Sequence, residues 1–347
     1  MDSAIQLCLP YLRNCDSSVL CLDENTLGSI ATLPNSCTIV SNRFDVAAQS
    51  DKAIFCDWDI KQGRETGNID CLAFRLSKEK AVNHHIINQA LSVLKDSGEL
   101  VFAGQKNQGV KGYAKALKNL LGNCEIEKHG LDYLCHATVT KQQNITPLDD
   151  QDYQELRPCL EHQGFDIQSK PGQFGWNKLD QGSLLLLEAL STELKVKPAK
   201  KILDLGCGYG LLSVGVALNN DLELLIATDN NAAAVASCSA NLSKVQEYRG
   251  QIPVGPAPYL VIADDCAANI SEKVDTVICN PPFHQGFDVE NQLCDKFLKS
   301  ARDHLLPSGR AYFVVNSFIG IEKKAQRFFQ QVDCLVNNKQ FKVLKLS

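Results

Sequence analysis

Three glycines at alternate positions, in Asp204-Leu205-Gly206-Cys207-Gly208-Tyr209-Gly210, separate a short apolar run from a segment of helical composition. The apolar run, 201–205, has the length and content of a buried strand, and 211–218 those of a helix. Alternate glycines let the backbone pass close to a ligand, because no Cβ stands in the way. The alternative is a tight strand-to-helix turn that binds nothing. The pattern favours an α/β fold with a ligand-binding turn.

The spacing of the glycines excludes two common nucleotide-binding loops. A nicotinamide fingerprint, G-x-G-x-x-G, would need its third glycine one residue later, where Leu211 stands. A phosphate-binding loop would need a Gly-Lys-Ser/Thr sequence, and none follows Gly210. The turn therefore indicates a ligand of another kind.

Apolar runs and helical segments continue to alternate after this turn. The expected strands are 224–228, 260–263, 276–279 and 311–315, and the expected helices are 232–242 and 293–304. Strands that alternate with helices imply a parallel sheet covered on both faces.

The first half of the chain repeats this plan in the same order. The matching segments are 19–22 with 202–205, 39–42 with 226–229, 54–57 with 261–264, 70–73 with 275–278, and 94–100 with 306–311. Five matches in one order indicate a tandem duplication. We expect domains at 1–140 and 153–347, joined by a polar linker at 141–152.

The first repeat lacks the features that make the second a ligand site. Asp23-Glu24-Asn25-Thr26 stands where the glycines would be, and Asn42 stands in place of Asp229. We therefore expect the first domain to bind no cofactor.

Composition indicates the class of protein and the cellular compartment. Hydrophobic residues are 44% and charged residues 22% of the 347, as in ordinary globular chains. No apolar run approaches the roughly 18 residues of a membrane span, and Met1-Asp2-Ser3-Ala4 lacks the positive charge of a secretory signal. The 15 cysteines are odd in number and include no C-x-x-C pair. We expect a cytoplasmic monomer with no membrane partner, no disulfide framework and no metal.

Asn280-Pro281-Pro282-Phe283 follows the fourth expected strand directly. Two consecutive prolines fix φ and disfavour a helix. The loop should therefore leave the sheet stiffly at the carboxyl edge of the strands, where open α/β folds bind ligands. A proline-rich turn with a buried phenylalanine is the alternative.

The residue types in this tetrapeptide suit methylation of a poorly nucleophilic nitrogen. An exocyclic base amine or an amide has a delocalised lone pair. The Asn280 side-chain oxygen and the Pro281 carbonyl can accept its two N–H groups and favour a tetrahedral nitrogen. Phe283 offers a flat face for stacking a flipped-out base. A carbon-directed pyrimidine enzyme would need a nucleophilic cysteine after proline, and Pro158-Cys159 lies on the wrong side of the glycines.

The glycine turn resembles the D-x-G-x-G-x-G motif of class I S-adenosylmethionine-dependent methyltransferases. That resemblance implies that Asp204, Gly206, Cys207, Gly208 and Gly210 surround the methionine part of the cofactor. It also implies that two acids bind the rest. The second-strand acid, Asp229, would accept the ribose hydroxyls, or would cap the following helix. Asp265 would accept the adenine amine beside the Cys266 amide, with Asp264 as the alternative.

Further segments narrow the resemblance to the RsmC family of bacterial 16S rRNA guanine-N2 methyltransferases. They are 171–174 (PGQF), 179–183 (LDQGS), 280–286 (NPPFHQG), 307–310 (PSGR), 316–318 (NSF) and 341–343 (FKV). The resemblance is strong over 171–343 and weak over the first 140 residues. It implies two tandem Rossmann-like methyltransferase domains, the first degenerate, with Asp180 near the cofactor or substrate pocket. The implied partner is 16S rRNA or the small ribosomal subunit.

The negative net charge of the chain is unusual for an enzyme that binds RNA. The chain carries −5, and neither half is basic, although phosphate contacts usually require a basic face. Lys106, Lys111, Lys115 and Lys118 are spaced like one helical face. They are candidate RNA contacts, or simply a solvated surface. We hypothesise that the first domain docks RNA or supports the second.

Rival functions remain open at this stage. Phe or Tyr at the fourth position of the tetrapeptide is shared by enzymes that methylate 23S rRNA guanine-N2, DNA adenine-N6 and protein glutamine-N5. A rival of another class is a non-catalytic ribosome-assembly protein that has kept the fold. The intact Asn280 and Asp229 favour an enzyme.

Overall fold

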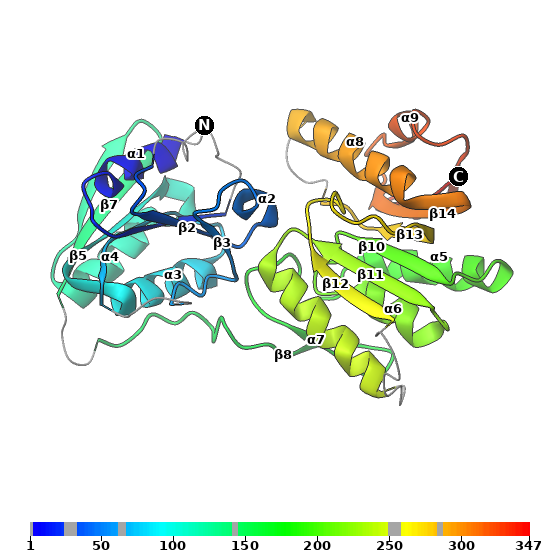
Figure 1. Cartoon of the computed structure of the whole chain (residues 1–347), viewed down its shortest axis with the longest axis horizontal. Coiled ribbons are helices and arrows are strands. Elements are labelled where there is room, and N and C mark those ends of the chain that lie inside the picture. Colours follow the sequence, from blue (N-terminus) through cyan, green and yellow to red (C-terminus); the bar gives the residue numbers. More distant parts are fainter. Residues whose placement is uncertain (1–2, 24–32, 62–66, 141–144, 249–257, 283–286) are drawn as a thin grey trace. The chain divides into compact units, whose positions relative to one another are not determined.

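The computed structural model describes residues 3–23, 33–61, 67–140, 145–248, 258–282 and 287–347. The chain divides into two compact units, Met1–Glu155 and Leu156–Ser347, each built on a seven-stranded sheet (Figure 1). Phe283 and most of Asp23-Glu24-Asn25-Thr26 lie outside the described residues. Within the described residues, no helix is both long and apolar enough to cross a membrane. The same residues contain no group of three or more His, Cys, Asp or Glu side chains placed to bind a metal ion.

The C-terminal unit begins with a two-stranded hairpin and continues as alternating strands and helices. Its strands are β8 (Arg157–His162), β9 (Phe165–Ser169), β10 (Lys201–Leu205), β11 (Leu224–Asp229), β12 (Tyr259–Ala263), β13 (Val274–Cys279), β14 (Leu305–Asn316), β15 (Val332–Asn337) and β16 (Phe341–Leu346). Its helices are α5 (Gln181–Val196), α6 (Leu211–Asn219), α7 (Ala232–Tyr248), α8 (Phe287–His304) and α9 (Glu322–Ala325).

The large sheet of this unit has the strand order β12-β11-β10-β13-β14-β16-β15. The first five strands pair in parallel, as the alternating pattern predicts. The sheet also contains two strands that were not predicted, β15 and β16, and β16 runs antiparallel to both β14 and β15. A short loop joins β15 to β16, and a connection without a crossover helix can join only antiparallel neighbours.

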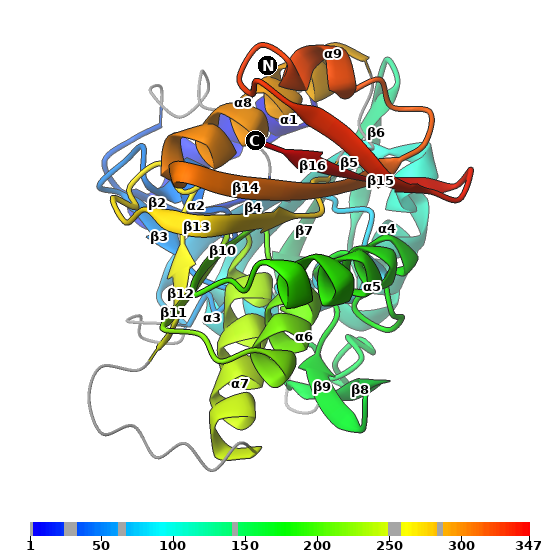
Figure 2. The same cartoon turned by 90° about the vertical axis from the view of Figure 1, so that its right-hand side faces the viewer.

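Helices cover both faces of this sheet. Buried residues of α5, α6 and α7 pack with Ile202 and Ile278 on one face. On the other face, Phe297 and Leu298 of α8 pack with Leu203. Figures 1 and 2 show α8 on one side of the strands and α6 and α7 on the other. Alternate strand residues thus enter opposite cores, which leaves the strand ends for a site.

The N-terminal unit has the same topology. Its strands are β1 (Ser18–Leu22), β2 (Cys37–Ser41), β3 (Ala53–Phe55), β4 (Ile69–Arg75), β5 (Leu94–Gln105), β6 (Glu125–His129) and β7 (Asp132–Val139). Its helices are α1 (Ser3–Leu12), α2 (Phe44–Ala47), α3 (Lys80–Val93), the short η2 (Lys106–Gln108) and α4 (Val110–Leu121). The order β3-β2-β1-β4-β5-β7-β6 repeats that of the second sheet position by position.

Local details repeat as well. The carboxylate of Asp70 accepts a hydrogen bond from the Ser17 N–H (2.8 Å), just before β1. Asp275 accepts one from the Lys201 N–H (2.8 Å) at the start of β10. Ser97 and Ser308, which precede matching glycines, share a left-handed φ of 63°. The prediction of two tandem Rossmann-like units is confirmed.

The stretch between the repeats lies against α3 where it is described. The Asn88 side chain exchanges two hydrogen bonds with the backbone of Leu148, and His85 pairs with Asp150 (2.9 Å). The buried ring of Tyr153 stacks on His85 and donates to Asp57 (2.7 Å). These contacts place residues 148–153 within the first compact unit.

Candidate active site

The glycine turn, Gly206–Gly210, is tied to the end of the neighbouring strand β11. The N–H groups of Gly206 and Cys207 donate to the Thr228 carbonyl (2.9 and 3.0 Å). The Gly208 N–H donates to Oδ2 of Asp229 (2.9 Å). All three glycines have positive φ, a conformation that side chains rarely adopt. The turn is therefore rigid and positioned by the sheet.

Two of these glycines have different surroundings. A Cβ on Gly210, where φ is 91°, would lie 2.8 Å from Sγ and 3.3 Å from Cα of Cys238 on α7. A Cβ on Gly208, where φ is 54°, would meet nothing within 4 Å. Gly210 thus serves the packing of α7 against the turn. Gly208 instead borders open space that a ligand can fill.

Asp204 lies beneath the turn and is fully buried. Its Oδ2 accepts a hydrogen bond from the Ser213 hydroxyl (2.6 Å), and Oδ1 has no partner among the described residues. Burial raises the pKa of this carboxyl from 3.8 to about 7, against the lowering effect of Ser213. The group is therefore partly protonated near neutral pH.

This raised pKa predicts a pH-dependent effect of Asp204→Asn. Between pH 3.8 and 7 the unfolded chain loses the Asp204 proton while the folded chain keeps it, so wild-type stability falls as pH rises. Above pH 7 both states are ionised and the loss is complete. The unfolding free energy of the variant should therefore rise relative to wild type by up to about 4 kcal/mol between pH 4 and 8. Urea unfolding of both proteins across this range measures it, and a constant difference would contradict the buried carboxyl.

The Asp229 carboxylate binds the backbone of the glycine turn and the backbone just before α7. Its Oδ2 holds Gly208, and its Oδ1 accepts from the Asn231 N–H (2.9 Å). The cap of α7 is Asn231, whose Oδ1 accepts from the N–H groups of Ala233 and Ala234 (2.9 and 3.2 Å). The alternative in which Asp229 caps the helix with its own side chain is thus wrong. A carboxylate has about four acceptor positions, so these contacts are compatible with ribose binding.

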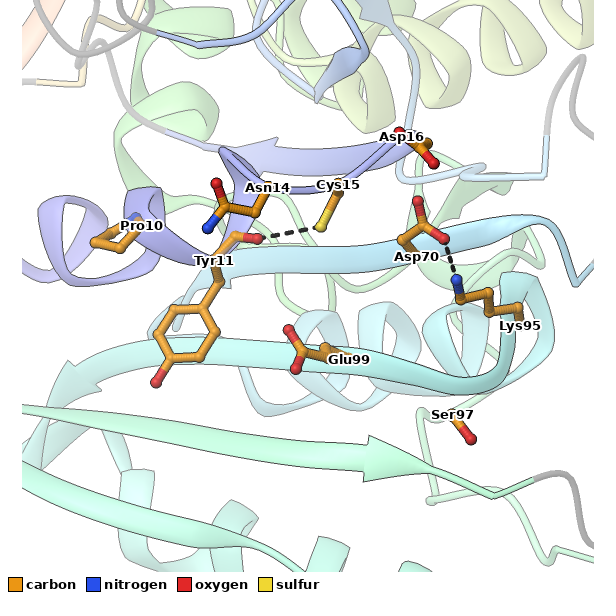
Figure 3. A pocket seen from close by; sticks show the side chains of 9 residues that line it. All are labelled: Pro10, Tyr11, Asn14, Cys15, Asp16, Asp70, Lys95, Ser97 and Glu99. Atoms are coloured by element: carbon orange, nitrogen blue, oxygen red, sulfur yellow. Dashed lines mark hydrogen bonds and ion pairs between the residues drawn. The ribbon is translucent and has the colours of Figure 1, made fainter.

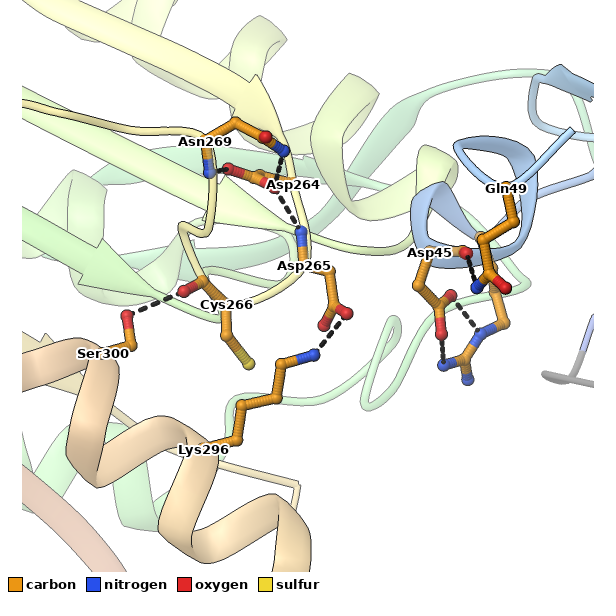
Figure 4. A network of polar contacts seen from close by, with 9 residues as sticks. Asp45, Gln49, Asp264, Asp265, Cys266, Asn269, Lys296 and Ser300 are labelled. Carbon is orange, nitrogen blue, oxygen red and sulfur yellow. Dashed lines mark hydrogen bonds and ion pairs between the residues drawn. The ribbon is translucent and has the colours of Figure 1, made fainter. Parts of the chain in front are cut away.

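The two acids after β12 have different environments, as Figure 4 shows. Asp264 is 1% exposed and accepts three hydrogen bonds, from the Asp265 N–H, the Asn269 N–H and the Asn269 side chain (2.7–2.9 Å). Asp265 is partly exposed and pairs with Lys296 of α8. Asp264 holds the turn, so Asp265 is the acid available to a ligand. No described residue accepts a hydrogen bond from the Cys266 N–H, and Cys266 has a φ of 54°.

Asn280 follows β13 at the carboxyl edge of the sheet. Strand β13 is the direct neighbour of β10, with Ile278 opposite Asp204, so the tetrapeptide and the glycine turn leave the sheet side by side. Pro281 is buried and Pro282 is exposed. No described residue donates to the Pro281 carbonyl. The structure brings these residues to one edge, as predicted.

The Asp180 side chain contacts Asn280, while its backbone hydrogen-bonds Tyr209 of the glycine turn. The Asn280 Nδ2 donates to Oδ2 of Asp180 (2.7 Å) and to the Ser183 hydroxyl (2.9 Å). Ser183 was not among the predicted site residues, although a residue three positions after an N-cap aspartate commonly donates its N–H to that carboxylate. Tyr209 was not predicted as a site residue either. Its hydroxyl donates to the Lys178 carbonyl (3.3 Å) and joins the glycine turn to the segment before α5.

Thiols near the site are unsuited to nucleophilic attack. Burial raises the pKa of Cys266 to about 12 and raises that of Cys279, which directly precedes Asn280. Only a thiolate is a good nucleophile. The pKa of Cys207 in the glycine turn is raised as well, so among the described residues of the site we find no reactive cysteine of the kind that carbon-directed methylation of a pyrimidine would require.

A cavity of about 530 Å³ lies elsewhere, in the N-terminal unit. Figure 3 shows Tyr11, Asp70, Lys95 and Glu99 around it, with Asp70 paired to Lys95 (2.5 Å). Asp70 and Lys95 stand at the starts of β4 and β5, so the cavity opens at the amino edge of the strands. Ligands of open α/β sheets bind at the opposite edge. This cavity is therefore not the counterpart of the candidate active site.

Family models match both units. Residues 164–345 match the model described as methyltransferase small domain, and residues 16–144 match its N-terminal counterpart. The first match covers more than half of the chain, so the chain belongs to the methyltransferase small domain family. The predicted class of enzyme is confirmed.

Particular relatives agree with the resemblance predicted from the motifs. A ribosomal RNA small subunit methyltransferase C from Mannheimia succiniciproducens is 27% identical, covering 80% of this chain and 78% of the relative. A relative of the same name from Buchnera aphidicola is 28% identical, and the match covers 80% of this chain and 76% of the relative. The solved structure of T. thermophilus 16S rRNA N2 methyltransferase RsmC, in complex with AdoMet and guanosine, matches with a TM-score of 0.80 at 23% identity. The match covers 100% of this chain and 92% of the RsmC chain, and this similarity establishes the fold.

Proposed function

We propose that the C-terminal unit methylates the exocyclic N2 amine of a guanine in 16S rRNA, with S-adenosylmethionine as the methyl donor. The observation that carries the proposal is the orientation of Asn280. Both N–H groups of its amide are directed at Asp180 and Ser183, which leaves the carbonyl oxygen for an incoming amine. The names of the curated relatives support 16S rRNA as the substrate. This substrate implies a cytoplasmic location, which we propose on the same basis.

The described residues fit the proposed cofactor. The open space at Gly208 can admit the methionine part, close to Gly206, Cys207 and Gly210 of the same turn and to the buried Asp204 at the end of β10. Asp229 would bind the ribose hydroxyls, and Asp265 with the Cys266 N–H would bind the adenine. S-adenosylmethionine supplies a methyl group on a positively charged sulfur, so the donor is already activated. Positioning of the acceptor can then provide most of the acceleration.

The protein's own groups bind and orient the acceptor nitrogen. Asn280 Oδ1 and the Pro281 carbonyl would each accept one N–H of the guanine amine. Two such bonds favour a tetrahedral nitrogen, whose lone pair then points toward the glycine turn. No residue needs to act as a strong base. Phe283, which is not among the described residues, would stack on the base.

The test of this function is methyl transfer to defined RNA. Purified enzyme is incubated with labelled cofactor and with 16S RNA, 23S RNA or ribosomal subunits from a strain that lacks the gene. Nucleosides are then analysed after digestion. N2-methylguanosine in 16S RNA or the small subunit supports the proposal. Label in 23S RNA would identify the large-subunit alternative. Label in the protein of the subunits, or no label at all, would exclude the proposed substrate.

We further propose that RNA docks on a lysine face of the N-terminal unit, formed by Lys111, Lys115 and Lys118 of α4 and by Lys106, which lies on the preceding η2 and not on the same helix as predicted. All four are exposed, and residues 106–121 contain no acid. Within the described part of the chain, no carboxylate forms an ion pair with them. Lys111 lies over the Tyr133 ring, 5.2 Å from its centroid. Unpaired surface cations of this kind suit phosphate neutralisation. In this division of labour, residues 1–140 hold RNA and 153–347 carry the chemistry.

Changing these four lysines to glutamine should weaken RNA binding in a salt-dependent way. If each contacts a phosphate, the slope of log affinity against log salt falls by roughly 3–4 in magnitude, because fewer counterions are released. Filter binding from 50 to 200 mM salt measures this slope. Lys78→Gln with Lys80→Gln, on an exposed site of the same unit, is the control. An unchanged slope in the fourfold variant would leave the face as a solvated surface.

Asp229→Ala should weaken cofactor binding by about 1–3 kcal/mol, the usual result of leaving polar partners unpaired. The Gly208 N–H also loses its acceptor, which loosens the glycine turn. Isothermal calorimetry measures the dissociation constant. Asn231→Ala is the matched control, because it removes the cap of α7 without removing the carboxylate. An unchanged constant in Asp229→Ala would rule out the ribose assignment.

A further inference from the structure

The amide of Asn280 is held by two acceptors on the first turn of α5. Its Nδ2 lies 2.7 Å from Oδ2 of Asp180 and 2.9 Å from Oγ of Ser183. A side-chain amide has two N–H donors on nitrogen and one carbonyl oxygen. Both donors are therefore used, and the oxygen points to the other side.

The two acceptors are themselves fixed. Asp180 is the N-cap of α5, and the same Oδ2 accepts from the Ser183 N–H (2.7 Å). Ser183 is buried, and α5 packs on β14 and β16. The preceding loop is tied to the glycine turn through Lys178 and Tyr209. The acceptors thus move with the helix and not with the Asn280 loop.

We infer that Asp180 and Ser183 are positioning residues that hold the Asn280 amide in one of its two orientations. A flipped amide would place its oxygen against the Asp180 carboxylate and lose that hydrogen bond, although the Ser183 hydroxyl could then donate to the oxygen. The held orientation presents an acceptor to the substrate. It therefore selects a group that brings N–H donors, such as an exocyclic amine, and disfavours a carbonyl such as guanine O6. This inference rests on the proposed function and gives Asp180, which was predicted near the cofactor or substrate pocket, the role of orienting Asn280.

Asp180→Ser separates positioning from capping. Serine is a good N-cap, so α5 keeps its first turn, but the shorter hydroxyl cannot reach Asn280. We expect kcat to fall about 10- to 100-fold, because the amide can flip, while the cofactor dissociation constant stays within about twofold. Ser183→Ala should show a smaller loss of the same kind. Calorimetry and single-turnover methylation of 16S RNA measure the two quantities.

An exchange of the two side chains provides a rescue. Asn280→Asp alone places two carboxylates in contact and should lower kcat strongly. Adding Asp180→Asn restores a donor and an acceptor in swapped positions, and should recover at least about tenfold of the lost rate. A merely structural role would not produce this recovery.

The outcomes separate this inference from the proposed function. Wild-type kcat in Asp180→Ser, or no recovery in the exchange variant, would overturn the positioning role while methylation by the wild type still supports the function. A raised cofactor dissociation constant in Asp180→Ser would instead assign Asp180 to the cofactor. Absence of guanine-N2 methylation by the wild type would remove the proposed function itself.

Discussion

Asn280→Ala is expected to lower kcat by about 10²–10³-fold while leaving the cofactor dissociation constant nearly unchanged. The Asn280 oxygen is assigned to the acceptor amine, and loss of one preorganised polar contact in an active site has an effect of this size. The side chain also donates to Asp180 and Ser183, so its removal frees those acceptors without touching the glycine turn. Single-turnover methylation and calorimetry give the two quantities.

The control for this variant is Asn119→Ala, an asparagine exposed on α4. It should change neither the rate nor the dissociation constant. Equal losses of rate and cofactor affinity in Asn280→Ala would mean that the side chain supports the cofactor pocket. The assignment to the acceptor amine would then be withdrawn.

Alanine at Gly210 should mainly weaken folding, and alanine at Gly208 should mainly weaken cofactor binding. At Gly210 the new Cβ meets Cys238 at 2.8 Å in a left-handed conformation, so folding should weaken by about 2–5 kcal/mol. At Gly208 the strain is similar in kind but no atom lies within 4 Å, so folding should weaken by only about 1–2 kcal/mol. The Gly208 methyl instead enters the space proposed for the cofactor, and the dissociation constant should rise at least tenfold.

Each variant serves as the control for the other. Urea unfolding compares their stabilities, and calorimetry compares their binding to S-adenosylmethionine. Normal cofactor affinity in Gly208→Ala would show that the ligand does not pass over this glycine. Equal stability of the two variants would contradict the close packing of α7 against the turn.

The central strands and the motifs between them were predictable from the sequence. Short apolar runs such as 201–205 can form only buried strands beside a glycine turn, and the position of Asn280 follows from the strand before it. The antiparallel strands β15 and β16 were not predicted. Polar residues interrupt the apolar ones in both sequences, and such a pattern carries a weaker signal than a continuous apolar run, although much of β16 is buried.

Contacts between distant segments were beyond sequence reasoning. Asp264 and Asp265 are neighbours with the same chemistry, and they are distinguished by the donors of Asn269 on Asp264 and by Lys296 on Asp265. The meeting of Asp180 with Asn280 depends on how α5 packs on the sheet. No local pattern connects two residues that are 100 positions apart.

The most direct test of the account is a crystal structure of the full chain with S-adenosylhomocysteine and guanosine. We predict the sulfur close to Gly208, the ribose on Asp229, and the guanine N2 within hydrogen-bond distance of Asn280 Oδ1. A ligand bound away from the glycine turn, or an Asn280 that presents its nitrogen to the guanine, would contradict it.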